Sequence, residues 1–115
     1  MRNDQLRLRD IEEAIQRIER YTVRGKEAFD MDELIQTWIV HHLQLIGEAC
    51  RVLPTEFRQQ HPEIPWGQII GMRHILVHHY FGIDADAVWT AATRDVPRLK
   101  IQIAALLPIS ETETL

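Results

Sequence analysis

Residues 65–84 read PWGQIIGMRHILVHHYFGID, and the rest of the chain is organised around this stretch. Apolar residues dominate it, but one arginine, three histidines and one tyrosine crowd into the positions from Arg73 to Tyr80. Proline is favoured in the first turn of a helix, and glycine just after the last turn. We therefore predict a helix from Pro65 to about Tyr80 that stops at Gly82, with its polar residues gathered at the C-terminal end.

The chemistry of these polar side chains suits a phosphodiester. Histidine can donate or accept a proton near neutral pH, and the planar guanidinium of arginine matches a phosphate. On a straight helix, however, Arg73 and His78 lie roughly 140° apart, whereas Arg73 and Tyr80 lie within about 20° of each other. The arginine and the histidine converge if the helix ends before His78, or if a two-fold dimer brings two copies of the stretch to one cleft.

The stretch also carries a family pattern, because Arg73, His78 and Tyr80 read as R-x4-H-x-Y. Together with the flanking sequences PEIPW, YFGID and IGEA, this pattern resembles the HepT-like toxins of the HEPN superfamily, which are small helical ribonucleases. The resemblance covers roughly residues 10–103. One position departs from it, since His74 stands where the family more often has asparagine.

The resemblance implies an activity and a role for each motif residue. It implies a metal-independent endoribonuclease, without a cofactor, that cleaves cellular RNA when a 2′-hydroxyl attacks its own phosphate. Arg73 would hold the scissile phosphate, His78 would move the proton and His74 would assist. It further implies a homodimer with a composite site, which agrees with the angle between Arg73 and His78.

Control by a partner is also implied by the resemblance. The partner is a minimal nucleotidyltransferase antitoxin that attaches AMP to the motif tyrosine, here Tyr80. An added phosphate brings negative charge and bulk to the place where the RNA phosphate must sit. Modification of Tyr80 would therefore silence the toxin.

Length and composition limit the alternatives. A chain of 115 residues with 45% hydrophobic and 26% charged residues is expected to form one domain, residues 1–108, with a frayed tail at 109–115. The net charge of −4 argues against a general nucleic-acid coat protein but allows a local basic site. No signal peptide or membrane span is apparent, and the lone Cys50 reads as a buried thiol, so we expect a cytoplasmic protein.

The first half of the chain predicts two long helices. Residues 4–22 carry one apolar stripe, made by Leu8, Ile11, Ile15 and Ile18. The charged residues off this stripe predict a solvated face. The alternative is a face that binds the phosphates of a nucleic acid. After a connection over residues 22–30, Asp30 is predicted to cap a helix that runs to about Leu53. The predicted apolar face of that helix comprises Leu34, Trp38, Leu45, Ala49 and Val52, widened by Ile35, Ile39, Ile46 and Leu53.

The second half adds shorter elements around the motif helix. A short helix is predicted at residues 55–60, and Asp84 or Asp86 is predicted to cap a last helix. Pro97 lacks an N–H group, so we expect a kink or break near Asp95, and Pro108 should end the helix. The whole pattern predicts an all-α fold, an antiparallel bundle of four to five helices that dimerises.

Other interpretations of the polar residues remain open. His74 and His78 are spaced as two metal ligands on one helix face, with His41 and His42 as a second pair, but no cysteine or cluster of carboxylates completes a site. Without the resemblance, Arg73 could form a structural ion pair, and Tyr80 could pack its ring in the core. The main rivals are a non-catalytic HEPN dimer that binds a nucleotide or a partner, and a purely structural dimerisation protein.

Overall fold

The computed structural model describes residues 2–77 and 84–108, and for residues 2, 3 and 73–77 it describes the backbone only. Every regular element in the described part is helical, and no strand occurs there. The elements are α1 (Arg2–Thr22), α2 (Lys26–Met31), α3 (Glu33–Val52), α4 (Thr55–Gln60), α5 (Trp66–Val77), α6 (Ala85–Thr90), the π-helical turn η1 (Ala91–Asp95) and α7 (Val96–Leu106). The predicted all-α class is confirmed.

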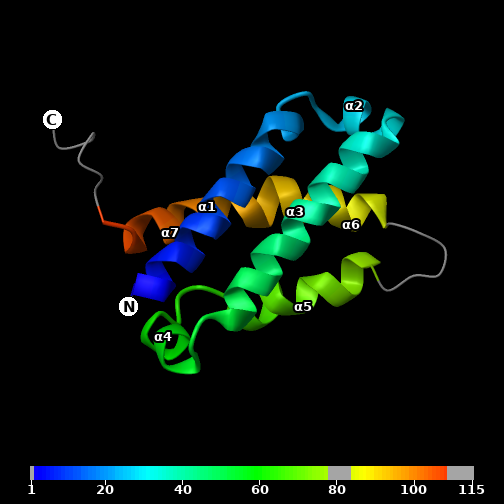
Figure 1. Ribbon diagram of the computed structural model, residues 1–115. Coiled ribbons are helices and arrows are strands. Elements are labelled where there is room, and N and C mark those ends of the chain that lie inside the picture. The colour runs from blue at the N-terminus through cyan, green and yellow to red at the C-terminus, as the bar shows by residue number, and fades with distance from the viewer. Residues whose placement is uncertain (1, 78–83, 109–115) are drawn as a thin grey trace, which may run out of the picture.

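The long helices form an antiparallel bundle. In Figure 1, α1 and α3 run side by side in opposite directions, and the continuous segment from α6 to α7 crosses behind both of them. α5 packs against α3 and contacts α6, with α4 at its N-terminal end. None of the described helices combines the length and the apolar character needed to cross a membrane.

The apolar stripe of α1 is buried as predicted. Leu8, Ile11, Ile15 and Ile18 are at most 2% exposed and pack into the core beside residues of α3. Each such side chain contributes about 1.5–3 kcal/mol when it leaves water. The predicted charged face of α1 is solvated, with an ion pair between Glu13 and Arg17.

The predicted apolar face of α3 is only partly buried. Leu34, Leu45 and Val52 are exposed, so their assignment to the core was wrong. The stripe of α3 that the neighbouring helices cover keeps the predicted Ile35, Ile39, Ile46 and Ala49 and adds Val40, Leu43 and Cys50. The sequence of α3 offers apolar residues around most of its circumference, and periodicity alone does not decide which stripe the neighbours cover.

The connection before α3 also differs from the prediction. It contains the short helix α2, which Phe29 anchors by complete burial. The cap of α3 is Asp32 and not Asp30: its carboxylate accepts hydrogen bonds from the N–H groups of Leu34 at 2.9 Å and Ile35 at 3.4 Å. Asp30 belongs to α2, where it pairs with Lys26. α2 ends at Met31 and α3 begins at Glu33, so the acidic residues Asp30 and Asp32 belong to the ends of two different helices.

The C-terminal segment follows the prediction closely. Asp84 is the cap of α6, since its carboxylate accepts a hydrogen bond from the Ala87 N–H at 3.1 Å. The expected break near Asp95 takes the form of the π-helical turn η1, which ends at that residue. Pro97 supplies no N–H to the helix ladder and crowds the preceding turn, so a widened turn is a physical consequence. α7 then ends before Pro108.

Candidate functional site

The motif begins inside α5 and continues beyond its last described residue. Arg73 and His74 lie in the last two turns of this helix, which ends in the structure at Val77. Their helical backbone agrees with the prediction. His78 and Tyr80 lie outside the described residues, so the convergence of Arg73 with His78 stays a prediction.

The N-terminal end of α5 is held firmly against α4. The Nε1 of Trp66 donates hydrogen bonds to the carbonyl oxygens of Arg58, at 3.1 Å, and His61, at 2.9 Å. Trp66 is 7% exposed, and its ring stands edge-on to that of Phe57. These contacts hold the end of α5 that lies away from the motif, and so position the helix backbone that carries Arg73 and His74.

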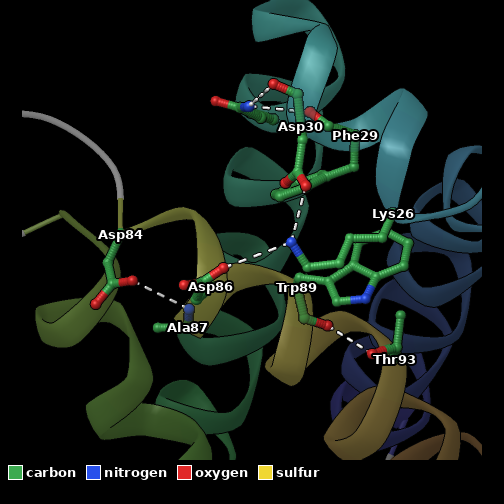
Figure 2. Close-up of polar contacts among 9 residues, drawn as sticks. Lys26, Phe29, Asp30, Asp84, Asp86, Ala87, Trp89 and Thr93 are labelled. Carbon is green, nitrogen blue, oxygen red and sulfur yellow. Dashed lines mark hydrogen bonds and ion pairs between the residues drawn. The ribbon is translucent and has the colours of Figure 1, made fainter.

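The chain beyond the motif is anchored at the start of α6. Figure 2 shows Lys26 of α2 between two carboxylates, at 2.8 Å from Asp30 and 3.6 Å from Asp86. The hydrogen bond to Asp30 is the main cause that raises the pKa of Lys26. Phe29 and Trp89 pack their rings beside this contact, with centroids 5.1 Å apart. The helix before the motif is therefore held by α4 and His61, and the helix after it by α2.

Two glycines leave part of the surface of α5 without side chains. Gly67 and Gly71 lie one turn apart, the first exposed and the second half-buried. A Cβ atom added to either glycine would meet no other atom within 4 Å. Small residues at this spacing allow another helix to approach closely. This open face lies on the same helix as Arg73.

A groove separates α5 from η1 and α7. Its first part has a volume of about 270 Å³, with apolar side chains such as Ile69 and Leu99 and the polar side chains of Arg98 and Gln102. A second hollow of about 510 Å³ adjoins it and reaches Asp84, at the start of α6. The two hollows share Gln68, Met72, Arg94 and Asp95. Met72 lines both hollows from α5, the helix that also carries the motif arginine.

The histidine pair of α3 is not a metal centre in the described part of the chain. His42 is 2% exposed, and its Nδ1 donates a hydrogen bond to the Trp38 carbonyl at 2.8 Å. Burial lowers the pKa of His42, and the nearby charge of His41 lowers it further. No group of three or more potential metal ligands gathers among the described residues. The structure thus assigns His42 to the core, next to the Trp38 ring.

Cys50 cannot serve as a nucleophile in the folded protein. Its side chain is fully buried, as predicted, and burial raises the pKa of its thiol to about 12. A thiol is reactive only as the thiolate, which would be scarce at neutral pH. Acyl-transfer chemistry through this residue is therefore excluded.

The geometry described above fits several classes of helical protein. Comparison with known families decides which class this chain belongs to. The model of the ribonuclease HepT-like family matches residues 11–106, a range that contains the whole R-x4-H-x-Y motif. The chain belongs to the HepT-like family. The resemblance carried by the motif and its flanks is confirmed.

Individual HepT-like relatives agree with this assignment. A Thermococcus cleftensis protein named "Probable ribonuclease HepT" is 42% identical over 81% of this chain and 86% of its own length. A candidate RNase of Caldanaerobacter subterraneus is 38% identical over 78% of this chain and 80% of its own. A Methanocaldococcus jannaschii protein, named for γ-glutamylcyclotransferase and a candidate RNase, is 36% identical over 93% of this chain but only 49% of its own length. No solved structure gives a significant match.

The polar residues that line the groove of this HepT-like chain were not predicted from the sequence. Arg94 and Arg98 are spaced by four residues on the last helix, and that spacing was a visible signal. Gln68 and Gln102 carried no signal, because only the tertiary fold places α5 and α7 on two sides of one groove.

Proposed function

We propose that this HepT-like protein is an endoribonuclease toxin that cleaves RNA without a metal ion. The observation that carries the proposal is the family match over residues 11–106, because that match contains the complete motif. Two of its relatives are named as ribonucleases or candidate ribonucleases over more than three quarters of this chain. The buried Cys50 offers no reactive thiolate, which agrees with a cleavage that needs no cysteine nucleophile.

In the proposed reaction the RNA supplies its own nucleophile. A ribose 2′-oxygen attacks the adjacent phosphorus, the bond to the 5′-oxygen breaks, and the proton from the 2′-hydroxyl ends on that 5′-oxygen. Arg73 stabilises the charge on the phosphoryl oxygens, His78 carries the proton and His74 assists. The products are a 2′,3′-cyclic phosphate and a 5′-hydroxyl.

The proposed site is composite, formed by two copies of the chain. On a straight helix Arg73 and His78 point about 140° apart, and a two-fold axis beside α5 would pair the arginine of one copy with the histidine of the other. The open face at Gly67 and Gly71 supports this arrangement, because it lets two α5 helices approach closely. A dimer of this kind has a mass about twice that of the 13.5 kDa chain.

Regulation is proposed to act at Tyr80. A minimal nucleotidyltransferase antitoxin would attach AMP to the phenol oxygen and so block the RNA phosphate by charge and bulk. The protein would act in the cytoplasm, where reducing conditions keep its single cysteine as a thiol.

Incubating purified, unmodified protein with a mixed RNA pool in EDTA tests the activity. We expect cleavage that persists in EDTA and leaves 2′,3′-cyclic phosphate ends. Cleavage that EDTA abolishes and that zinc or manganese restores would favour a metal bound by His74 and His78. Binding of RNA with no cleavage under either condition would favour the rival function, a non-catalytic HEPN dimer.

Co-expression with the antitoxin tests the regulation. Intact-mass spectrometry should find wild-type protein heavier by one or more AMP units and Tyr80→Phe protein unchanged. Tyr80→Phe should keep much of its cleavage activity, because a phenol with a pKa near 10 is a poor base at neutral pH. An adduct that persists in the Tyr80→Phe protein would place the modification elsewhere.

A further inference from the structure

The groove between α5 and the η1–α7 segment contains polar groups that the rest of the described structure leaves unused. Gln102 donates a hydrogen bond through Nε2 to the Glu63 carbonyl at 2.9 Å, which fixes the orientation of its amide. Its Oε1 is buried and accepts no hydrogen bond from the described part of the chain. A buried acceptor without a donor is unfavourable, so few such groups remain in folded proteins.

Two arginines stand beside this oxygen along the same groove. Arg94 and Arg98 are both exposed and lie one helical turn apart, about 6 Å along the axis. Arg94 contacts its neighbour Asp95 at 3.3 Å, whereas Arg98 has no ion-pair partner within the described ranges. Two guanidinium groups at this spacing suit two successive phosphates of a single strand.

The charge along the groove is uneven. At the end near α6, Asp84 accepts the cap hydrogen bond from Ala87 and Asp86 pairs with Lys26. At the other end, Arg98 and Gln102 border an apolar floor that includes Ile69 and Leu99. Phosphates are therefore favoured at the Arg98 end, with a base or ribose against the apolar floor.

We propose that the Arg98 end of this groove is a binding subsite for single-stranded RNA, in which Arg94 and Arg98 hold phosphates and the apolar floor receives a base or ribose. The proposal rests on the ribonuclease function above and names where the substrate is held outside the motif. Met72 lines the groove from α5, the helix that also carries Arg73, so the subsite lies beside the helix of the motif. Because the chain carries a net charge of −4, RNA binding depends on local cations such as Arg98, which lies at the end of the groove away from Asp84 and Asp86.

The test measures binding of a 12-nucleotide, mixed-sequence 2′-O-methyl RNA, which cannot be cleaved, by fluorescence anisotropy at several salt concentrations. The double variant Arg94→Gln/Arg98→Gln should bind about tenfold more weakly. Its slope of log affinity against log salt should be shallower by about 1.4, since each phosphate contact on a single strand contributes about 0.7. Arg98→Lys, which keeps the charge, should bind within a few-fold of wild type.

The matched control is Arg7→Gln/Arg9→Gln on α1, which makes the same change in charge away from the groove. Its affinity should stay close to that of wild type. Equal weakening in the control, unchanged affinity in the groove variant, or no binding by wild type would each overturn the subsite.

Cleavage of an unmodified RNA separates this proposal from the proposed function. If both hold, the groove variant raises KM and leaves kcat nearly unchanged. If wild type cleaves and the groove variant has an unaltered KM, the subsite is wrong and the ribonuclease stands. If wild type binds the modified RNA through the groove but cleaves no RNA, the subsite stands and the ribonuclease is wrong.

Discussion

The surface of α1 and the groove beside α5 use arginine in opposite ways. On α1, Arg7 lies 3.8 Å from Asp10, Arg9 lies 3.8 Å from Glu12, and Arg17 pairs with Glu13. In the groove, Arg94 contacts Asp95 at 3.3 Å, but Arg98 has no carboxylate partner among the described residues, and the Oε1 of Gln102 accepts no hydrogen bond there. The helix with the most arginines is therefore not the surface best suited to phosphate, because intrahelical partners offset its charge.

The comparison separates two kinds of expected mutational effect. Substitutions in the α1–α3 half should change the free energy of unfolding and leave RNA cleavage intact. Substitutions along α5 and the residues that follow should change cleavage or assembly and leave the fold intact. The predictions below test that division, beginning with the largest effect.

The largest effect is expected at the motif. Arg73→Ala and His78→Ala should each lower the cleavage rate by about 10²–10⁴-fold, the usual loss on removing a proton-transfer group or a charge stabiliser. Circular dichroism should show the helical content of wild type. An unfolded Arg73→Ala protein would instead assign the arginine to a structural ion pair.

The second prediction concerns the open face of α5. Gly71→Leu should give a monomer by light scattering and lower the cleavage rate about 10²-fold, because the composite site would be misplaced. The monomer should remain folded, since the added side chain starts in open space. Leu45→Glu, on the exposed face of α3, is the control and should remain a dimer. Loss of the dimer in Leu45→Glu alone would move the interface to α3.

A third prediction concerns His42 and acid. Since burial lowers the pKa of His42, the unfolded chain binds the extra proton first as the pH falls below about 6.5. Its contribution to stability is therefore present above that pH and is lost progressively below it. His42→Gln should lose less stability than wild type between pH 7.5 and about 5, measured by urea unfolding.

The same experiment includes two comparisons. His42→Gln should be less stable than wild type at pH 7.5 by about 1–3 kcal/mol, because it disturbs a buried hydrogen bond to Trp38. His41→Gln, on the exposed neighbour, should keep most of the acid sensitivity of wild type, because burial is the main cause of the lowered pKa of His42 and the charge of His41 a smaller one. Equal pH profiles for wild type and His42→Gln would contradict the assignment.

The smallest effect is expected at the ion pair between α1 and α7. Lys100 lies 2.9 Å from Glu19, and both side chains are partly exposed to solvent. Lys100→Gln should lower the free energy of unfolding by about 0.2–1 kcal/mol, less at high salt, and leave cleavage unchanged. A marked loss of cleavage in Lys100→Gln would break the division between the two regions.

Much of the fold could be predicted because its signals are local. The stripe of α1, the helix at residues 55–60, the Asp84 cap and the break near Asp95 all depend on residues within one or two turns of each other. Where two local signals compete, the prediction was wrong. Asp30 and Asp32 both stand before a run of apolar residues, and only the burial of Phe29 makes α2 a separate helix and leaves Asp32 as the cap.

In the candidate site, too, the local part could be predicted and the part formed by distant residues could not. The R-x4-H-x-Y motif is contiguous, so the sequence alone revealed it, and the family match agrees. The groove joins Gln68 to Arg98 and Gln102 across more than thirty residues of sequence, and no periodicity links such distant positions.

By itself, the sequence determined the helical class, most helix boundaries, the burial of Cys50 and the membership of the HepT-like family. The tertiary structure alone decided which stripe of α3 is buried and which arginines lie beside a carboxylate. A helical pattern sets the angle of each side chain about its own axis, but burial and pairing depend on which other helix lies at that angle. Leu45 and Ile46 are adjacent apolar residues, yet only Ile46 faces a neighbouring helix and leaves water.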